Sequence, residues 1–254
     1  MWNLVRASAK ASLGSDPTVY PVEERVGEDM LQRWIVELLR PLLQRWLGHR
    51  GPPAFVGADQ FIYYLPHTPI LRVSPDIYVL PGVAPETRVR SWKTWEKGIV
   101  PSFALEVVST EWEKDYVEGP ERYGEMGIPE LLIFDPASRR HVHGVRWQVF
   151  RRIAGRRLAR VEVSESDRVR SKALGCFLRV VGEGDALRLR VGTGPRGEEL
   201  FPTGEETERA AKERERLAKE AAIAARDAAL ERVLALEARL RSPRPGRRRA
   251  PKNA

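Results

Sequence analysis

Apolar residues near the start of the chain recur at intervals of three and four positions. Between Leu31 and Leu43 they fall on one side of an ideal helix, which predicts an amphipathic helix from residue 28 to about residue 47. Pro41 lies inside this pattern and lacks a backbone donor, so we expect a kink or a division there. The preceding stretch, 1–27, contains several turn-forming residues and predicts an irregular arm.

Beyond this helix the pattern changes to short apolar runs separated by turn residues. The runs AFVGADQFIYYL, ILRVSPDIYVLPG and PSFALEVVS are typical of strands. EWEKDYVEGPERYGEMG is polar with spaced aromatics and predicts a helix that Gly119 and Pro120 break or restart. IPELLIFDP follows as a buried strand. A helix between two apolar runs predicts a right-handed crossover, with ALEVVS and ELLIF parallel in a mixed α/β sheet.

The rest of the chain predicts more strands and then one long helix. WQVFRRI, RLARVEV, CFLRVV and ALRLRVG predict strands that extend or flank the sheet, so the α/β domain would cover residues 28–200. Residues 205–241 contain no Gly or Pro and predict one continuous helix. Its apolar stripe is weak, so a coiled coil and a solvated or back-folded helix both stay open. Residues 242–254 predict a basic, disordered tail.

Composition limits the kind of protein this can be. The 254 residues, 42% of them hydrophobic, suffice for a sizeable core. The single cysteine, Cys176, excludes a disulfide framework and favours the cytoplasm. No apolar run approaches the roughly 20 residues of a membrane span, so we expect a soluble protein. The net charge of +8 favours an anionic partner such as DNA, although solvated arginine-rich faces are an equal explanation.

Two acids stand in apolar, strand-like surroundings: Asp76 in VSPDIYVL and Glu106 in FALEVVS. Burying a carboxylate is costly unless a cation, donor or metal compensates it. Strand alternation places Glu106 on the side of Ala104 and Val108. Acids on neighbouring strands can share a divalent cation such as Mg²⁺ or Mn²⁺. The alternative is that Asp76 caps a turn and Glu106 pairs with an arginine.

A cation held in this way could support phosphodiester hydrolysis, because it orients and acidifies a water and neutralises charge on the phosphate. A nearby lysine would then bind the scissile phosphate or the attacking water. Lys114, close after Glu106, is the candidate for this role. Glycine-rich nucleotide loops, zinc-spaced ligands and a nucleophilic serine elbow find no support in the sequence, and we expect no organic cofactor.

SPDIYVLPG, PSFALEVVS and KDY…ERYGEMGIPELLIFDP together resemble the Uma-two family of restriction-endonuclease-like proteins. The resemblance implies the PD-(D/E)XK nuclease fold, a mixed sheet flanked by helices, here with a long C-terminal helix. It implies metal-dependent cleavage of DNA, with Asp76 and Glu106 as metal ligands. The backbone carbonyl of Val107 would be a third ligand. Glu28, on the first helix, and Asp115 are possible supporting acids, although the helix dipole alone explains Glu28.

The motif lysine is missing from both of its expected places. The position two residues after Glu106 is Val108, and the position that family members use on the next helix is Gly119. Lys114 can substitute for it if its flexible stem reaches the same point. We therefore predict a metal-dependent DNA endonuclease, possible self-association through residues 205–241, and no membrane contact. The alternative is a catalytically silent protein that binds DNA or a protein and assembles through its long helix.

Overall fold

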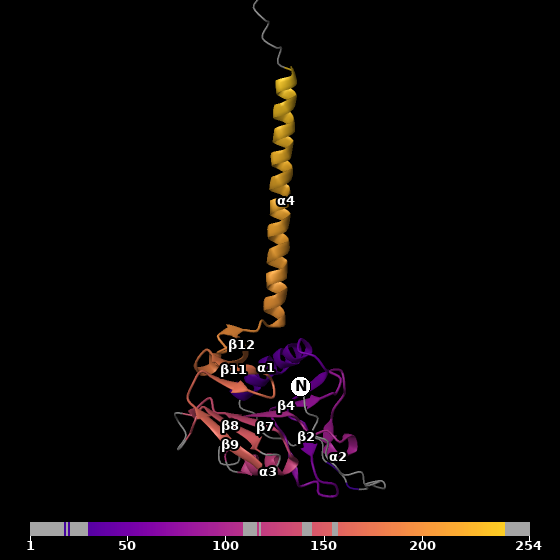
Figure 1. Ribbon diagram of the computed structural model, residues 1–254, viewed down its shortest axis with the longest axis vertical. Helices are drawn as coiled ribbons and strands as arrows, with labels where there is room; N and C mark the ends of the chain where they lie inside the picture. The colour runs from indigo at the N-terminus through magenta and orange to yellow at the C-terminus, as the bar shows by residue number, and fades with distance from the viewer. Residues whose placement is uncertain are drawn as a thin grey trace, which may run out of the picture. The chain divides into compact units, whose positions relative to one another are not determined.

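The central element of the fold is a six-stranded mixed sheet, seen in the computed structural model of the protein (Figure 1). The structure describes residues 18, 20, 30–108, 116, 118–138, 144–153 and 157–241. In spatial order the strands of this sheet are β1 (Ala54–Gly57), β4 (Ile77–Pro81), β6 (Phe103–Val107), β7 (Glu130–Phe134), β8 (Trp147–Ile153) and β9 (Arg157–Ser164).

Of the adjacent strand pairs in this sheet, β6 and β7 run parallel and the others run antiparallel. The predicted parallel pairing of ALEVVS with ELLIF is therefore confirmed, as is the mixed α/β class with a long C-terminal helix. The connection between β6 and β7 contains α3 (Gly119–Met126). Pro120 lies in the first turn of α3, where its missing N–H costs no helical hydrogen bond.

One face of the six-stranded sheet is covered by α1 (Met30–Gly48) and by a second, four-stranded sheet. The strands of this second sheet are β10 (Arg168–Ser171), β11 (Cys176–Val181), β12 (Arg188–Thr193) and β13 (Glu199–Leu200), with a short 3₁₀ helix (Gly184–Ala186) before β12. The buried side of α1 consists of Ile35, Val36, Leu39, Leu42, Leu43 and Leu47. The helix α1 continues through Pro41, so it is not divided there, and a kink at Pro41 stays a prediction. Pro41 faces solvent, where water can satisfy the carbonyl that loses its partner.

The opposite face carries α3 and a small three-stranded sheet, together with the short helix α2 (Thr94–Lys97). This small sheet contains β2 (Phe61–Tyr63), β3 (Arg72–Val73) and β5 (Ser91–Lys93). The run AFVGADQFIYYL therefore forms two strands in different sheets. Between them Asp59 adopts a left-handed backbone conformation with φ of 60°, and the Gln60 side chain accepts from the Ala58 N–H.

The second unit of the chain, Pro202–Ala254, contains α4 (Gly204–Arg241). Every residue of this 38-residue helix is exposed. Ion pairs one turn apart, including Glu205 with Arg209 and Glu215 with Lys219, add a little helical stability. None of the helices that the structure describes is long and apolar enough to cross a bilayer.

A buried carboxylate joins the two large sheets. Glu130, at the start of β7, is 2% exposed. Its Oε1 accepts from Arg151 Nε at 2.8 Å and from the Lys172 N–H at 3.0 Å. Its Oε2 accepts from the Ser171 hydroxyl and from the Ala173 N–H. Because all four donors converge on one side chain, Glu130 fixes the turn after β10 against β7 and β8.

Cys176 begins β11 beside this turn and is 4% exposed. Burial raises the pKa of its thiol to about 12. A thiol that stays protonated at neutral pH is a poor nucleophile, so the structure assigns Cys176 to the core.

We expect Glu130→Ala to lower the free energy of unfolding by about 3 to 5 kcal/mol, because it leaves the partly buried Arg151 and the turn donors without their acceptor. Denaturant titration of the full chain measures this loss. The matched control is Glu37→Ala, which breaks an exposed pair with Arg33 and should cost less than about 0.5 kcal/mol. Equal effects of the two substitutions would contradict the structural role of Glu130.

Candidate active site

The candidate site lies at the end of the six-stranded sheet, where β4 begins beside β6. In the antiparallel register of these strands Ile77 pairs with Leu105, so Asp76, one residue earlier, comes opposite Glu106. Ala104 and Val108, on the same side of β6 as Glu106, are both in the core beneath α3. Side chains opposite one another on neighbouring strands have Cβ atoms about 5 Å apart. The structure therefore brings Asp76 and Glu106 together.

Two hydrogen bonds join Asp76 and β6 reciprocally. The Val107 N–H donates to Asp76 Oδ2 at 2.6 Å. In return, the Asp76 N–H donates to Glu106 Oε2 at 3.4 Å, which is a long hydrogen bond. Asp76 is 5% exposed and Glu106 is half-buried. The Asp76 carboxylate thus acts across the sheet.

A helix on each side of the sheet supplies one further donor. Gln32 of α1 donates from Nε2 to Asp76 Oδ1 at 2.5 Å. From α3, the Tyr123 hydroxyl donates to Glu106 Oε1. Tyr123 is 1% exposed, so it both packs the helix on the sheet and orients Glu106.

The end of α3 is itself held firmly, which fixes the position of Tyr123. Gly127 adopts a left-handed conformation with φ of 96°, and its N–H donates back to Tyr123 and Gly124 carbonyls. Arg152 Nη2 donates to the Gly124 carbonyl at 2.7 Å. Burial lowers the pKa of the Arg152 guanidinium. Since a cation at a helix C-terminus interacts favourably with the dipole, Arg152 stabilises the helix end nearest Tyr123.

The oxygen atoms of the pair fit a hard cation. Each of the four carboxylate oxygens accepts from a neutral donor, and an ionised carboxylate offers about four lone-pair positions. In an antiparallel ladder the N–H and C=O of one residue point to the same neighbouring strand, so the Val107 carbonyl faces the Asp76 side. Two carboxylates and one carbonyl are ligands of the kind that Mg²⁺ takes, together with several waters.

The described residues contain no cluster of three or more His, Cys, Asp or Glu side chains that could hold a metal ion. A metal bound here would therefore depend on the Asp76 and Glu106 pair, on backbone oxygens and on water. Glu28, Lys114 and Asp115 lie outside the described residues. Their roles stay predictions.

The structure explains why two expected lysine positions are occupied by other residues. Val108 is 4% exposed in the core beneath α3, where an ammonium group would be buried. Gly119 is the first residue of α3, directly before Pro120. Trp92 is 7% exposed, and its indole N–H donates to the Ile99 carbonyl at 2.9 Å.

Sequence reasoning missed Gln32 and the contacts of Asp135. Asp135, fully buried at the end of β7, accepts from the Tyr116 hydroxyl at 2.5 Å. This bond fixes one point of the connection between β6 and α3 next to the site. Gln32 is a polar residue among the apolar positions of α1, and Asp135 ends the run ELLIFD. These two features of the sequence could have suggested both residues.

Comparison with known proteins adds a family match. The family model described as "Uma2: Putative restriction endonuclease" matches residues 22–180, which include Asp76 and Glu106. A solved structure described as "a putative nuclease belonging to DUF820 from Anabaena variabilis" is similar, with 12% sequence identity and a TM-score of 0.41. The alignment covers 60% of this chain and 78% of that chain. No curated protein matches the sequence.

We expect Asp76→Ala to lower the free energy of unfolding by about 1 to 3 kcal/mol, because the Val107 N–H then lacks its acceptor. Asp76→Asn keeps an acceptor oxygen of the same shape and should cost less than about 1 kcal/mol. Thermal or denaturant unfolding of both variants checks this. If Asp76→Asn lowered the free energy of unfolding as much as Asp76→Ala, the hydrogen bond to β6 would not be the contribution of Asp76 to stability.

Proposed function

Because the chain belongs to the Uma2 family, we propose that it is a metal-dependent endonuclease that hydrolyses DNA phosphodiester bonds. The observation that supports this most is the reciprocal hydrogen bonding of Asp76 with β6, which places two carboxylates side by side at the end of the sheet. Both acids lie within the family match. A cytoplasmic place of action, expected from the single cysteine, is part of the same proposal.

In this proposal Asp76, Glu106 and the Val107 carbonyl hold Mg²⁺ or Mn²⁺. The ion would acidify a water molecule and neutralise charge on the phosphate. Gln32 and Tyr123 act as positioning residues, because each fixes one carboxylate oxygen. Lys114 would bind the scissile phosphate or the attacking water, with Glu28 and Asp115 as supporting acids. Lys114 precedes Tyr116 by two residues, and Tyr116 is held by Asp135 next to Glu106.

A second function is favoured by one specific observation. The two lysine positions of the nuclease motif are filled by a core valine, Val108, and by Gly119. If Lys114 does not replace the missing charge, the protein keeps the fold and the acid pair and binds DNA or a protein without cutting.

Plasmid cleavage with Mn²⁺ tests the endonuclease proposal. We expect Asp76→Asn, Glu106→Gln and Lys114→Ala each to reduce cleavage at least about 100-fold, because the first two weaken the proposed metal site and the third removes the charge proposed to act on the phosphate or the attacking water. Lys212→Ala, an exposed lysine of α4, is the matched control and should cleave normally. Undiminished cleavage by Glu106→Gln would overturn the assigned site. No cleavage by any form, over several DNA types, would favour the silent protein.

Calorimetric titration with Mn²⁺, in the absence of DNA, separates metal binding from cleavage. Binding should weaken in Asp76→Asn and Glu106→Gln and persist in Lys114→Ala, because the lysine is not a ligand. Loss in all three variants, or in none, would contradict these roles.

We also propose that α4 joins two copies of the chain. Ile223 and Leu230 are seven residues apart, as are Val233 and Leu240, and the two series are offset by three positions. These are a and d positions of a heptad. All four side chains are at least 51% exposed. Pairing of two such stripes would bury them, whereas the charged first half of α4 offers no comparable seam.

Light scattering after size exclusion measures the oligomeric state. We expect wild type to be a dimer and Leu230→Lys to shift it towards monomer, because a charge replaces a seam residue. The control is Leu217→Lys, on a different side of the helix, about 140° away from Leu230. A monomeric wild type at high protein concentration, or an equal effect of both substitutions, would contradict dimerisation through this stripe.

A further inference from the structure

A basic hollow lies away from Asp76 and Glu106, in the corner between the six-stranded sheet and β10. It has a volume of about 400 Å³ and is lined by Arg151, Glu162, Arg170, Ser171, Lys172 and Gly175. Three of these residues are cations and one, Glu162, is a half-buried acid. The hollow is separate from the candidate active site. Glu130 lies behind the hollow. Along β7 it is three residues, or about 10 Å, from Ile133, which pairs with Glu106.

The hollow also lies on the other face of the sheet. Glu130 contacts the turn after β10, whereas Glu106 contacts Tyr123 of α3. Its walls are fixed by Glu130. Arg151 donates from Nε to Glu130 and from Nη2 to the Arg170 carbonyl at 2.8 Å, and the Lys172 N–H is anchored on the same carboxylate. The backbone that carries the cations is therefore preorganised.

Two of these cations are not used by the fold. Within the described residues, the Lys172 ammonium and the Arg170 guanidinium make no hydrogen bond or ion pair, and both residues are exposed. Arg170 lies 5.9 Å from the centre of the Phe177 ring, which orients its side chain over β11. Two charges on a fixed backbone around a hollow are suited to a phosphate group, which accepts from Lys and Arg together.

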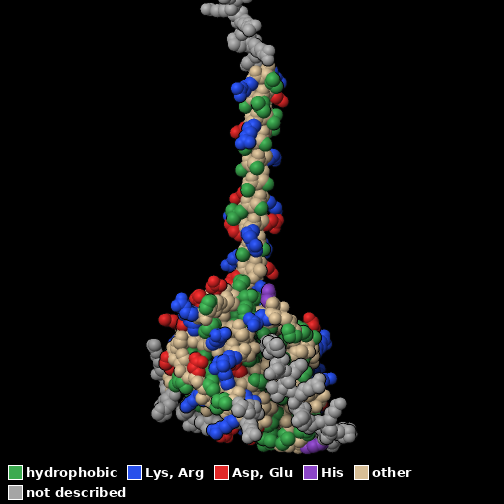
Figure 2. Space-filling model, in the orientation of Figure 1, with side chains coloured by type: hydrophobic (Ala, Val, Ile, Leu, Met, Phe, Trp, Pro, Cys, Tyr) green, Lys and Arg blue, Asp and Glu red, His purple; other side chains and the backbone are tan. Residues whose placement is uncertain are grey.

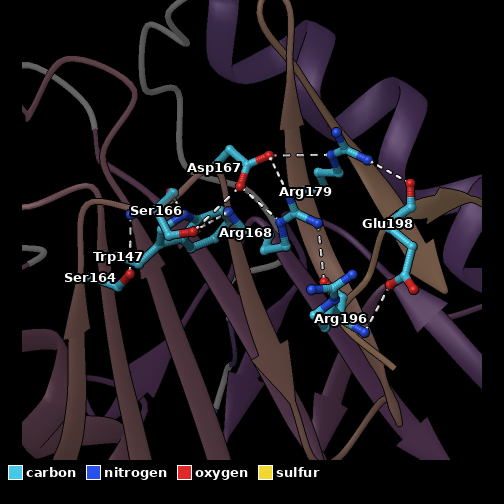
Figure 3. Close-up of polar contacts among 8 residues, drawn as sticks. All are labelled: Trp147, Ser164, Ser166, Asp167, Arg168, Arg179, Arg196 and Glu198. Atoms are coloured by element: carbon cyan, nitrogen blue, oxygen red, sulfur yellow. Dashed lines mark hydrogen bonds and ion pairs between the residues drawn. The ribbon is translucent and has the colours of Figure 1, made fainter. Parts of the chain in front are cut away.

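The outer face of the second sheet extends this positive charge. Arg168, Arg179 and Arg190 lie directly opposite one another on β10, β11 and β12. Like charges in this arrangement destabilise a sheet. Figure 3 shows how the first two are held: Asp167 lies between Arg168 and Arg179, at 2.8 and 3.3 Å. The hydrogen bond from Arg168 lowers the pKa of Asp167, so this carboxylate stays ionised at neutral pH.

The remaining anchors of these arginines are mostly neutral. Arg168, Arg179 and Arg190 donate to the backbone carbonyls of Arg196, Glu198 and Phe201, respectively. A carbonyl orients a guanidinium group but does not cancel its charge. Figure 2 shows Lys and Arg side chains over this part of the domain. The face next to the hollow therefore carries more positive than negative charge.

We propose that the hollow formed by Arg151, Arg170 and Lys172 binds a phosphate group of a DNA backbone, as a contact separate from the cleavage site. The phosphate chemistry rests on the hollow itself. The choice of DNA as the molecule that carries this phosphate group rests on the proposed function, and a free phosphate compound is the alternative. The arginines of the neighbouring face attract the polyanion and orient it towards Arg170.

Fluorescence anisotropy with a labelled DNA duplex in EDTA tests this without cleavage. For the double variant Arg170→Ala with Lys172→Ala we expect affinity at least about tenfold weaker at 0.1 M salt. The slope of log K against log salt should fall by about 2, because two phosphate contacts are lost. The matched control, Lys212→Ala with Arg232→Ala on α4, removes the same charge elsewhere and should bind nearly as wild type. Arg170→Lys with Lys172→Arg should restore binding.

Titration with inorganic phosphate distinguishes the two sources. Loss of DNA affinity in the hollow variant alone supports the proposal in full. Unchanged DNA affinity, with loss of inorganic phosphate binding, overturns DNA as the source and leaves a small phosphate compound. No change in either, or an equal loss in the α4 control, overturns the phosphate site. Because this binding is measured in EDTA and does not depend on cleavage, failure of the cleavage proposal and failure of this one give different results.

Discussion

The structure of the candidate site depends on one constraint: two carboxylates must stand side by side at the ends of two neighbouring strands, β4 and β6, whose other residues are apolar. Asp76 meets this constraint by accepting from the Val107 N–H while its own N–H donates to Glu106. Because these bonds require β4 and β6 to be neighbours, they make the strand order of the sheet part of the site. Gln32 and Tyr123 then tie the same carboxylates to α1 and α3. The two helices that cover the sheet thus also orient its acids.

The local hydrophobic pattern was sufficient to predict strands and helices whose buried residues recur at regular intervals. WQVFRRI and CFLRVV form β8 and β11 with the expected bounds, and the crossover after FALEV was confirmed. The hydrophobic pattern was not sufficient where the conformation of a few residues determines the path of the chain. β10 (Arg168–Ser171) alternates charged and buried positions over only four residues, which is too short to distinguish from a loop. Likewise the separation of β1 from β2 depends on the left-handed Asp59, a conformation that sequence permits but does not impose.

For the candidate site, the sequence suggested Asp76 and Glu106 as candidate residues but not what holds them. Alternation correctly placed Glu106 on the side of Ala104 and Val108, because strand geometry is local. The partners of the acids are set by tertiary structure: Gln32 lies 44 residues from Asp76, and Tyr123 lies 17 from Glu106. No periodicity relates such positions. The role of Lys114 also stays a prediction, because its distance in sequence from Glu106 does not determine whether its side chain reaches the site.

The chain contains a third acid in an apolar strand, Glu130, whose partners can be compared with those of Asp76 and Glu106. Each oxygen of Glu130 accepts two hydrogen bonds, so its lone pairs are fully used by Arg151 and by one turn. Each oxygen of Asp76 and Glu106 accepts from a neutral donor. Glu130, by contrast, is paired with the cation Arg151 and holds the fold together. The pair oriented by neutral donors is the one proposed above to hold a cation, and the difference in partners follows from tertiary contacts that the two sequence contexts do not reveal.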